Sequence, residues 1–178
     1  MINQTKKLLL GINHSLLFLC TAMYLGTGWS LVLFSFPVSD QLTPANYYLQ
    51  FVPQVTAATK FFTYMTLVMI GASLIMIIAE WRSNLRWYPI GVLLGVTMAT
   101  ALTIIYIIPY NEQMSAGITN EDILRDVLQK WMRLNVIRVS LWTAQWLCMM
   151  AYFFTKYLNY DTGTTAYRTY YAKAKMAL

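Results

Sequence analysis

The sequence predicts an all-α integral membrane protein: a four-transmembrane-helix bundle whose fourth helix is extended outward by an amphipathic segment. Hydrophobic residues make up 58% of the 178 residues and charged residues only 11%. Four stretches are long and apolar enough to cross a bilayer, for which roughly 20 residues suffice. These spans are Leu8 to Phe36, Phe61 to Glu80, Tyr88 to Ile108 and Asn135 to Leu158. No part of the chain is left for a second domain, so residues 1–178 are expected to form one membrane domain.

The first span and the segment after it differ in character. The first stretch is too long for a secretory signal peptide, and no small-residue cleavage site follows it, which predicts an uncleaved span. The next segment, residues 37–59, contains Pro37, Pro44 and Pro53. Three prolines make a single long helix there improbable. This segment is therefore expected to be an external loop.

Small residues recur every four positions along the third span, at Gly91, Gly95, Ala99 and Thr103. Such a face allows two helix backbones to approach each other closely. Packing within the bundle is the favoured interpretation, and a contact between two copies of the chain is the alternative.

An amphipathic helix is expected at residues 120–134, before the fourth span. Gly117 interrupts the preceding segment, and Thr119 or Asn120 can cap the new helix. Apolar residues then recur at helical spacing, with charged ones opposite. We expect this helix to continue into the fourth span as one rod that reaches about Tyr157. Its length would be on the order of 55 Å at about 1.5 Å per residue.

The distribution of charge predicts the orientation in the membrane. The N-terminus, the loop between spans two and three, and the C-terminal tail carry eight basic residues against two acidic ones. The other two connections carry five of each. The positive-inside rule therefore places the N- and C-termini in the cytoplasm, in a membrane of the bacterial inner-membrane type. The net charge of +6 follows from this bias, and its dispersal argues against nucleic acid as a partner.

Five polar or aromatic residues form a stripe along the start of the fourth span. They are Trp131, Asn135, Arg138, Trp142 and Gln145, and steps of four, three, four and three residues put them on one helix face. Polar side chains on a membrane helix usually face a neighbouring helix or a wet cavity. The stripe is therefore the candidate site, as a ligand-binding or a structural polar cluster.

Two further polar residues are expected at the same depth, because Asn111 and Glu112 follow the third span directly. A Glu112–Arg138 ion pair would lessen the cost of a charge near the apolar layer. Trp131 and Trp142 could then line an aromatic pocket for a flat, apolar molecule with a few oxygens. The alternative is that Arg138 only ties the loop to the helix or reaches the membrane surface.

The sequence contains few residue patterns that would indicate metal binding, cofactor binding or nucleophilic catalysis. The single histidine, His14, and two isolated cysteines make no zinc-type cluster, and no metal site is predicted. The sequence contains no Gly-x-Ser-x-Gly elbow, phosphate loop or dinucleotide-binding glycine motif. No cofactor is expected, and His14 is expected to hydrogen-bond inside the bundle.

The chain resembles the anthrone-oxygenase-like family of small four-helix membrane proteins, most of unknown function. The resemblance rests on Pro109-Tyr110-Asn111, the acidic amphipathic helix, and Trp131 followed seven residues later by Arg138. It also includes Gly26, Gly28 and Pro37, and extends to about Tyr152. It implies oxidation of anthrone-type polyketides by oxygen without an obvious cofactor, with attention on Asn111, Trp131 and Arg138. Family members often have a histidine where this chain has Asn135, and an amide is no general base.

Three classes of function remain open. The favoured one is a non-catalytic accessory subunit of a larger membrane assembly, with other membrane subunits or further copies of the chain as partners. The alternative is a cofactor-poor membrane oxygenase or a binding protein for an apolar aromatic or quinone-like molecule. A transporter or channel is the weakest class, because few charges fall within the spans. A stripe facing an enclosed pocket would favour binding, and a solidly packed stripe would favour the assembly.

Overall fold

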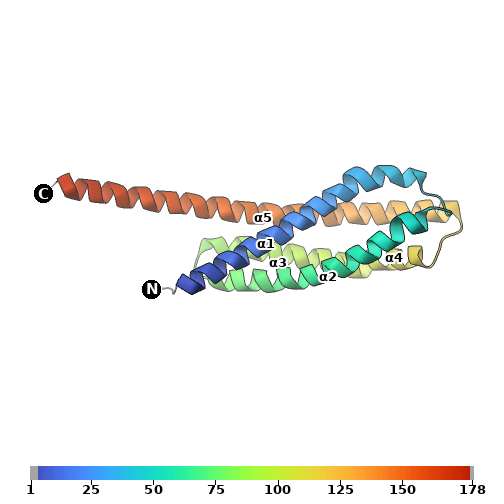
Figure 1. The fold of residues 1–178 in the computed structure, drawn as a ribbon, viewed down its shortest axis with the longest axis horizontal. Helices are drawn as coiled ribbons and strands as arrows, with labels where there is room; N and C mark the ends of the chain where they lie inside the picture. The colour runs from blue at the N-terminus through green and yellow to red at the C-terminus, as the bar shows by residue number, and fades with distance from the viewer. Residues whose placement is uncertain (1–3, 177–178) are drawn as a thin grey trace.

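The computed structural model describes residues 4–176, with side chains described for residues 4–160, and its regular elements in that range are all helical (Figure 1). The first group is α1 (Gln4–Ser30), the π-helical turn η1 (Leu31–Ser35) and the 3-10 helix η2 (Phe36–Gln41). The second is α2 (Tyr47–Ala79) and the short 3-10 helix η3 (Asn84–Arg86). The third is α3 (Trp87–Leu102), the π-helical turn η4 (Thr103–Ile107) and α4 (Ile108–Ser115). The last is α5 (Glu121–Met176).

Four long helices pack in a ring, in which α1 contacts α2, α2 contacts α3, α3 contacts α5 and α5 contacts α1. Both ends of the chain lie at the same end of the bundle, and α4 lies at the opposite end (Figure 1). Among the described residues, three segments are long and apolar enough to cross a membrane, namely Gln4–Gln41, Tyr47–Ala79 and Asn84–Ser115; α5, which contains the fourth expected span, is not one of them. The expected all-α class is therefore confirmed, together with helices of membrane-spanning length.

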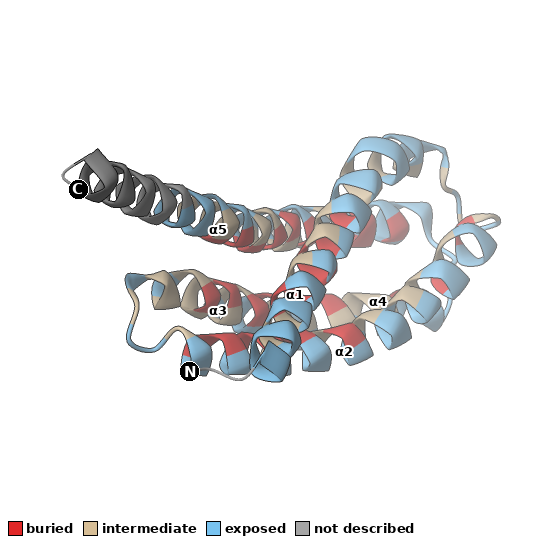
Figure 2. Ribbon diagram, turned by 60° about the vertical axis from the view of Figure 1, so that its left-hand side comes forward, coloured by how far each residue is buried: buried red, intermediate tan, exposed pale blue. Residues whose placement is uncertain are grey.

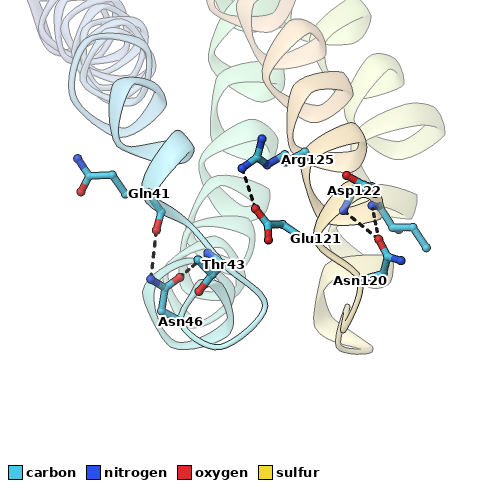
Figure 3. A network of polar contacts seen from close by, with 8 residues as sticks. Gln41, Thr43, Asn46, Asn120, Glu121, Asp122 and Arg125 are labelled. Carbon is cyan, nitrogen blue, oxygen red and sulfur yellow. Dashed lines mark hydrogen bonds and ion pairs between the residues drawn. The ribbon is translucent and has the colours of Figure 1, made fainter.

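The amphipathic segment and the fourth predicted span form one continuous helix, α5, as the sequence predicted, but the helix continues to Met176 and does not end at about Tyr157. Gly117 ends the preceding helix with a φ of 91°, a left-handed conformation that glycine adopts without steric cost. Asn120 caps α5, because its Oδ1 accepts hydrogen bonds from the backbone N–H groups of Asp122 (2.9 Å) and Ile123 (3.1 Å) (Figure 3). An exposed ion pair between Glu121 and Arg125, at 2.7 Å, follows in the first turn.

The second helix begins earlier than the prolines suggested. Residues 47–59, expected to belong to an external loop, form the first turns of α2, and Pro53 lies inside the helix. A proline within a helix costs roughly 3 kcal/mol through a lost hydrogen bond and a steric clash. Tertiary contacts offset this cost here. Tyr47 is buried, its hydroxyl donates to the carbonyl of Met114 at 3.0 Å and accepts from the N–H of Ile118.

Two clusters of buried side chains hold the bundle together, and the buried positions lie on the helix faces that meet (Figure 2). The larger cluster joins α1, α2, α3 and α5 and includes Leu17, Met69, Val92 and Met149. The smaller cluster lies at the end opposite the chain termini, where the starts of α2 and α5 meet α4. The two clusters therefore hold the helices together on either side of the region that lies between them.

Glycines allow the polar face of α5 to come close to its neighbours. A Cβ atom at Gly28 of α1 would lie 2.8 Å from the Trp142 ring, and one at Gly95 of α3 would lie 2.6 Å from the Gln145 side chain. These distances are shorter than van der Waals contact. The small-residue face of α3 therefore packs inside the bundle, as favoured from the sequence.

We predict that Gly28→Ala lowers the free energy of unfolding by about 1 to 3 kcal/mol, the usual cost of overpacking. The added methyl group would meet the Trp142 ring, which has little freedom to move. Thermal unfolding of the detergent-solubilised protein measures the effect. Gly26→Ala is the matched control, because a Cβ atom at Gly26 meets nothing within 4 Å. It should be neutral or slightly stabilising, since alanine favours helix by about 1 kcal/mol over glycine. Equal effects of the two substitutions would contradict the prediction.

Candidate functional site

The polar stripe of α5 faces the interior of the bundle. The exposed fractions are 3% for Trp131, 0% for Asn135, 5% for Trp142 and 1% for Gln145, and Arg138 is half-buried. Their spacing along α5 puts them on the face that contacts α1 and α3. Buried polar groups usually require hydrogen-bond partners, so the partners of each side chain decide what the stripe does.

Hydrogen bonds link four of the predicted residues in sequence. The indole Nε1 of Trp131 donates to Oδ1 of Asn111 at 2.8 Å, which joins α5 to α4. Nδ2 of Asn135 donates to the backbone carbonyl of Trp131 at 2.8 Å, so its Oδ1 is directed away from that carbonyl. Nη2 of Arg138 donates to this Oδ1. Asn135 therefore orients the guanidinium group.

Other polar atoms of the stripe, outside this series of hydrogen bonds, have no hydrogen-bond partner among the described residues. The guanidinium of Arg138 lies over the Trp142 ring, with its carbon 4.7 Å from the ring centroid. Nε of Arg138 is buried and, among the described residues, has no hydrogen-bond partner. The same holds for both amide atoms of Gln145. Such groups are costly in an apolar interior unless something else binds them.

A cavity of about 790 Å³ adjoins the stripe, between α1, α2, α3 and α5. Five of the seven predicted site residues line it: Asn111, Trp131, Arg138, Trp142 and Gln145. The rest of the wall is mostly apolar, and its aromatic side chains are Tyr24, Phe34, Phe51 and Phe62. Pockets for small molecules commonly measure about 300 to 1,000 Å³ and combine apolar walls with a few polar groups. The cavity has the size and lining of a small-molecule site.

Both π-helical turns of the described chain border this cavity. η1 contributes Leu31, Phe34 and Ser35, and η4 contributes Thr103, Ile104 and Ile107. π-helical turns occur frequently at functional sites. Side chains at the edge of the cavity are also exposed on the outside of the bundle, with exposed fractions of 69% for Phe34, 63% for Leu67 and 60% for Ile104. The cavity therefore reaches the apolar outer surface of the helices.

The prediction of an ion pair between Glu112 and Arg138 is wrong. Among residues 4–160, neither side chain takes part in an ion pair, and Glu112 lines a separate hollow of about 300 Å³ together with Lys60. The reason is geometric, because consecutive residues of a helix point about 100° apart. Asn111 faces α5, so Glu112 faces α2. Of the seven predicted residues, Glu112 and the fully buried Asn135 do not line the larger cavity.

A second polar cluster, toward the end of the bundle that holds the chain termini, was not identified from the sequence. The hydroxyl of Tyr152 donates to Oε1 of Glu80 at 2.7 Å and lies 3.2 Å from Nδ1 of His14. Nζ of Lys156 pairs with the same Glu80 oxygen at 2.8 Å. His14 thus hydrogen-bonds within the bundle, as expected. Tyr152 and Lys156 continue the spacing of the stripe beyond Gln145, and this was the signal available in the sequence.

The pKa of Glu80 reflects competition between burial and these partners. Burial of the carboxyl group, whose side chain is 14% exposed, would raise the pKa. Hydrogen bonds from Lys156 and Tyr152 and the charge of Lys156 outweigh burial, so the pKa of Glu80 lies below its usual value. A carboxyl group with a lowered pKa stabilises the fold above its unfolded-state pKa, and this contribution is lost as the pH falls.

We predict that Glu80→Gln lowers the melting temperature by several degrees at pH 7, because Lys156 and Tyr152 lose an ionised acceptor. The difference from the unmodified protein should shrink as the pH falls below about 4, where the carboxylate becomes protonated. Thermal unfolding of the solubilised protein at both pH values checks this. Glu121→Gln, which breaks an exposed ion pair with Arg125, should have little effect at either pH. A Glu80→Gln effect independent of pH would count against the carboxylate.

The arrangement offers one cation, several hydrogen-bonding groups and aromatic walls, all suited to binding a flat molecule. Within the described residues, no three His, Cys, Asp or Glu side chains lie close enough together to hold a metal ion. Comparisons with protein-family models, curated proteins and solved structures found no match.

Proposed function

We propose that this protein crosses a membrane four times and binds an apolar, ring-bearing molecule with polar oxygens in the cavity beside α5. The observation that carries the proposal is the pairing of aromatic walls with unpartnered polar atoms of Arg138 and Gln145. The aromatic surface suits a planar ring system, which gains by stacking and edge contacts. The polar atoms would fix its orientation through hydrogen bonds.

The fourth span in this proposal is the part of α5 at residues 135–158. It runs alongside α1 and α3, which belong to the segments Gln4–Gln41 and Asn84–Ser115 that are long and apolar enough to cross a membrane. The occurrence of both chain ends at one end of the bundle supports an even number of crossings (Figure 1). The positive-inside rule then assigns that end to the cytoplasm. On this basis the cavity occupies the outer half of the membrane.

Access to the cavity would come from the lipid. The exposed side chains at its edge, Phe34, Leu67 and Ile104, are apolar and belong to segments of membrane-spanning length. An apolar molecule dissolved in the bilayer could therefore enter sideways between helices without crossing water. This entry route supports a membrane-soluble ligand.

Binding is better supported than turnover. Among the described residues that line the cavity there is no histidine, aspartate or glutamate, the usual general acids and bases. Asn135 stands where the anthrone-oxygenase-like family often has a histidine, and its amide is used to orient Arg138. Oxidation of a bound anthrone-type molecule therefore remains only the alternative activity.

A role as an accessory subunit is the second candidate. The C-terminal part of α5 extends past the other three long helices, where it could contact a partner protein (Figure 1). The side chains of that part, including the tyrosine-rich tail, lie outside the described residues. The cavity beside the polar stripe favours binding, because a purely structural stripe would be expected to pack solidly.

We predict that both termini face the cytoplasm. Fusion of green fluorescent protein to the C-terminus should give fluorescent bacterial cells, whereas fusion of alkaline phosphatase there should give no phosphatase activity. A phosphatase fusion within residues 115–119, between α4 and α5, should be active. Phosphatase activity at the C-terminus would contradict the fourth crossing or the assigned orientation.

We predict that 9,10-anthraquinone, a flat three-ring diketone, binds the purified protein saturably and quenches its tryptophan fluorescence. Trp131 and Trp142 line the cavity, so they would lie next to the bound ring system. Ala58→Phe should weaken binding at least about tenfold, because Ala58 lines the cavity and a benzyl group would occupy the ligand volume.

Ala57→Phe is the matched control, since Ala57 is exposed and does not line the cavity. It should leave the dissociation constant unchanged. Absence of saturable quenching, or equal binding by the two variants, would overturn the proposed function.

A further inference from the structure

We propose that the ligand of the cavity is a ring-bearing acid, bound with its ionised oxygens on the guanidinium of Arg138 and its rings against the apolar walls. This inference rests on the proposed function and adds the charge and orientation of the ligand. The chemical class is a flat, membrane-soluble monoanion. A neutral quinone or hydrocarbon is the contrasting class.

The charges around the cavity are unbalanced. Arg138 is the sole lysine, arginine, aspartate, glutamate or histidine among the described residues that line it. Tyr24, also in the wall, is a neutral phenol at neutral pH, and its hydroxyl is engaged with the carbonyl of Phe62 (3.1 Å) and the hydroxyl of Thr66 (2.6 Å). Glu112, the acidic residue expected to balance Arg138, lines a different hollow. The described walls therefore carry a single positive charge without a carboxylate.

The hydrogen-bonding capacity of Arg138 is also underused. A guanidinium group has five N–H donors. One of its nitrogens, Nη2, donates to the amide oxygen of Asn135, and one face of the group lies on Trp142. Nε is buried and has no hydrogen-bond partner among the described residues. A carboxylate or similar anion can accept two parallel hydrogen bonds from such a group, which a single carbonyl oxygen cannot.

The cost of an unbalanced charge selects for an anionic ligand. A charge removed from water without a counter-ion is strongly unfavourable in a low-dielectric interior. Asn135 and Trp142 offset this cost only through dipoles and the ring quadrupole. An anion would add a full opposite charge at short range, which a neutral ligand cannot. One cation is best matched by one negative charge, so a dianionic phosphate would leave an excess charge in the apolar layer.

The rest of the stripe suggests how the ligand lies. Gln145 follows Arg138 by seven residues, about two helical turns or roughly 10 Å along α5. Its unpartnered amide can accept or donate a hydrogen bond at the far end of the ligand. Apolar side chains such as Phe62 and Val96 belong to the same cavity wall. A molecule of two or three fused rings, acidic at one end and carrying an oxygen at the other, fits this spacing.

The test compares anthraquinone-2-carboxylate with the neutral anthraquinone-2-carboxamide, which has nearly the same shape. Both are titrated at pH 7 against the purified full-length protein, with tryptophan quenching as the readout. The expected result is at least about tenfold tighter binding of the carboxylate. Arg138→Gln should remove this preference, and Arg138→Lys should keep part of it, because lysine retains the charge but not the planar donor pair.

Lys130→Gln controls for non-specific attraction of anions to a protein of net charge +6. Lys130 is exposed and pairs with Asp126, so its loss removes one positive charge outside the cavity and should leave the preference unchanged. Equal binding of carboxylate and carboxamide by the unmodified protein would overturn the inference even if no Arg138 variant folds. A preference that survives Arg138→Gln would overturn it as well.

Failure of the two proposals can be told apart with unsubstituted anthraquinone. If anthraquinone binds but the carboxylate has no advantage, the charge assignment fails and the binding function stands. If none of the three compounds binds saturably, both proposals fail.

Discussion

One face of α5 is polar and has to be enclosed within an otherwise apolar bundle, and this requirement shapes how the long helices pack. α5 carries Asn135, Arg138 and Gln145 on one side, and the other three long helices must cover that side. Gly28 and Gly95 permit this, because any larger residue would collide with Trp142 or Gln145. Since helices in an apolar solvent gain little from hydrophobic burial, such close backbone contact is an important source of stability.

Buried polar and charged side chains have different kinds of partners at the two ends of the bundle. Near the chain termini, Glu80, Lys156, Tyr152 and Nδ1 of His14 lie within hydrogen-bond distance of one another, while Nε2 of His14 is buried and has no partner among the described residues. In the other half, Arg138 has neutral partners, and a cavity takes the place of a counter-ion. The network near the chain termini balances its lysine with a carboxylate, whereas Arg138 lies beside a cavity without a carboxylate among the described lining residues. The contrast within one chain supports a functional role for the Arg138 half.

The cavity lies where the regular α-helical winding of α1 and α3 is interrupted. α1 and α3 both change to π-helical turns at their ends away from the chain termini, in η1 and η4. A π-helical turn accommodates an extra residue and redirects the side chains that follow it. The apolar cluster that fills the space between the helices on the terminal side therefore does not continue, and the second cluster closes the bundle beyond the cavity. Rigid packing on both sides can keep the walls in place for a ligand.

Periodicity in the sequence was enough to predict the helical class, the inward side of α5, a cap for that helix at Thr119 or Asn120, and internal packing as the favoured role of the small residues on α3. These features follow from local periodicity, which a single helix already contains. Three features became visible only in the folded protein: Pro53 lies within a helix, Glu112 turns away from Arg138, and His14 lies against Tyr152. Each of these depends on contacts between segments far apart in the chain, and spacing within one segment carries no information about which neighbour its side chains meet.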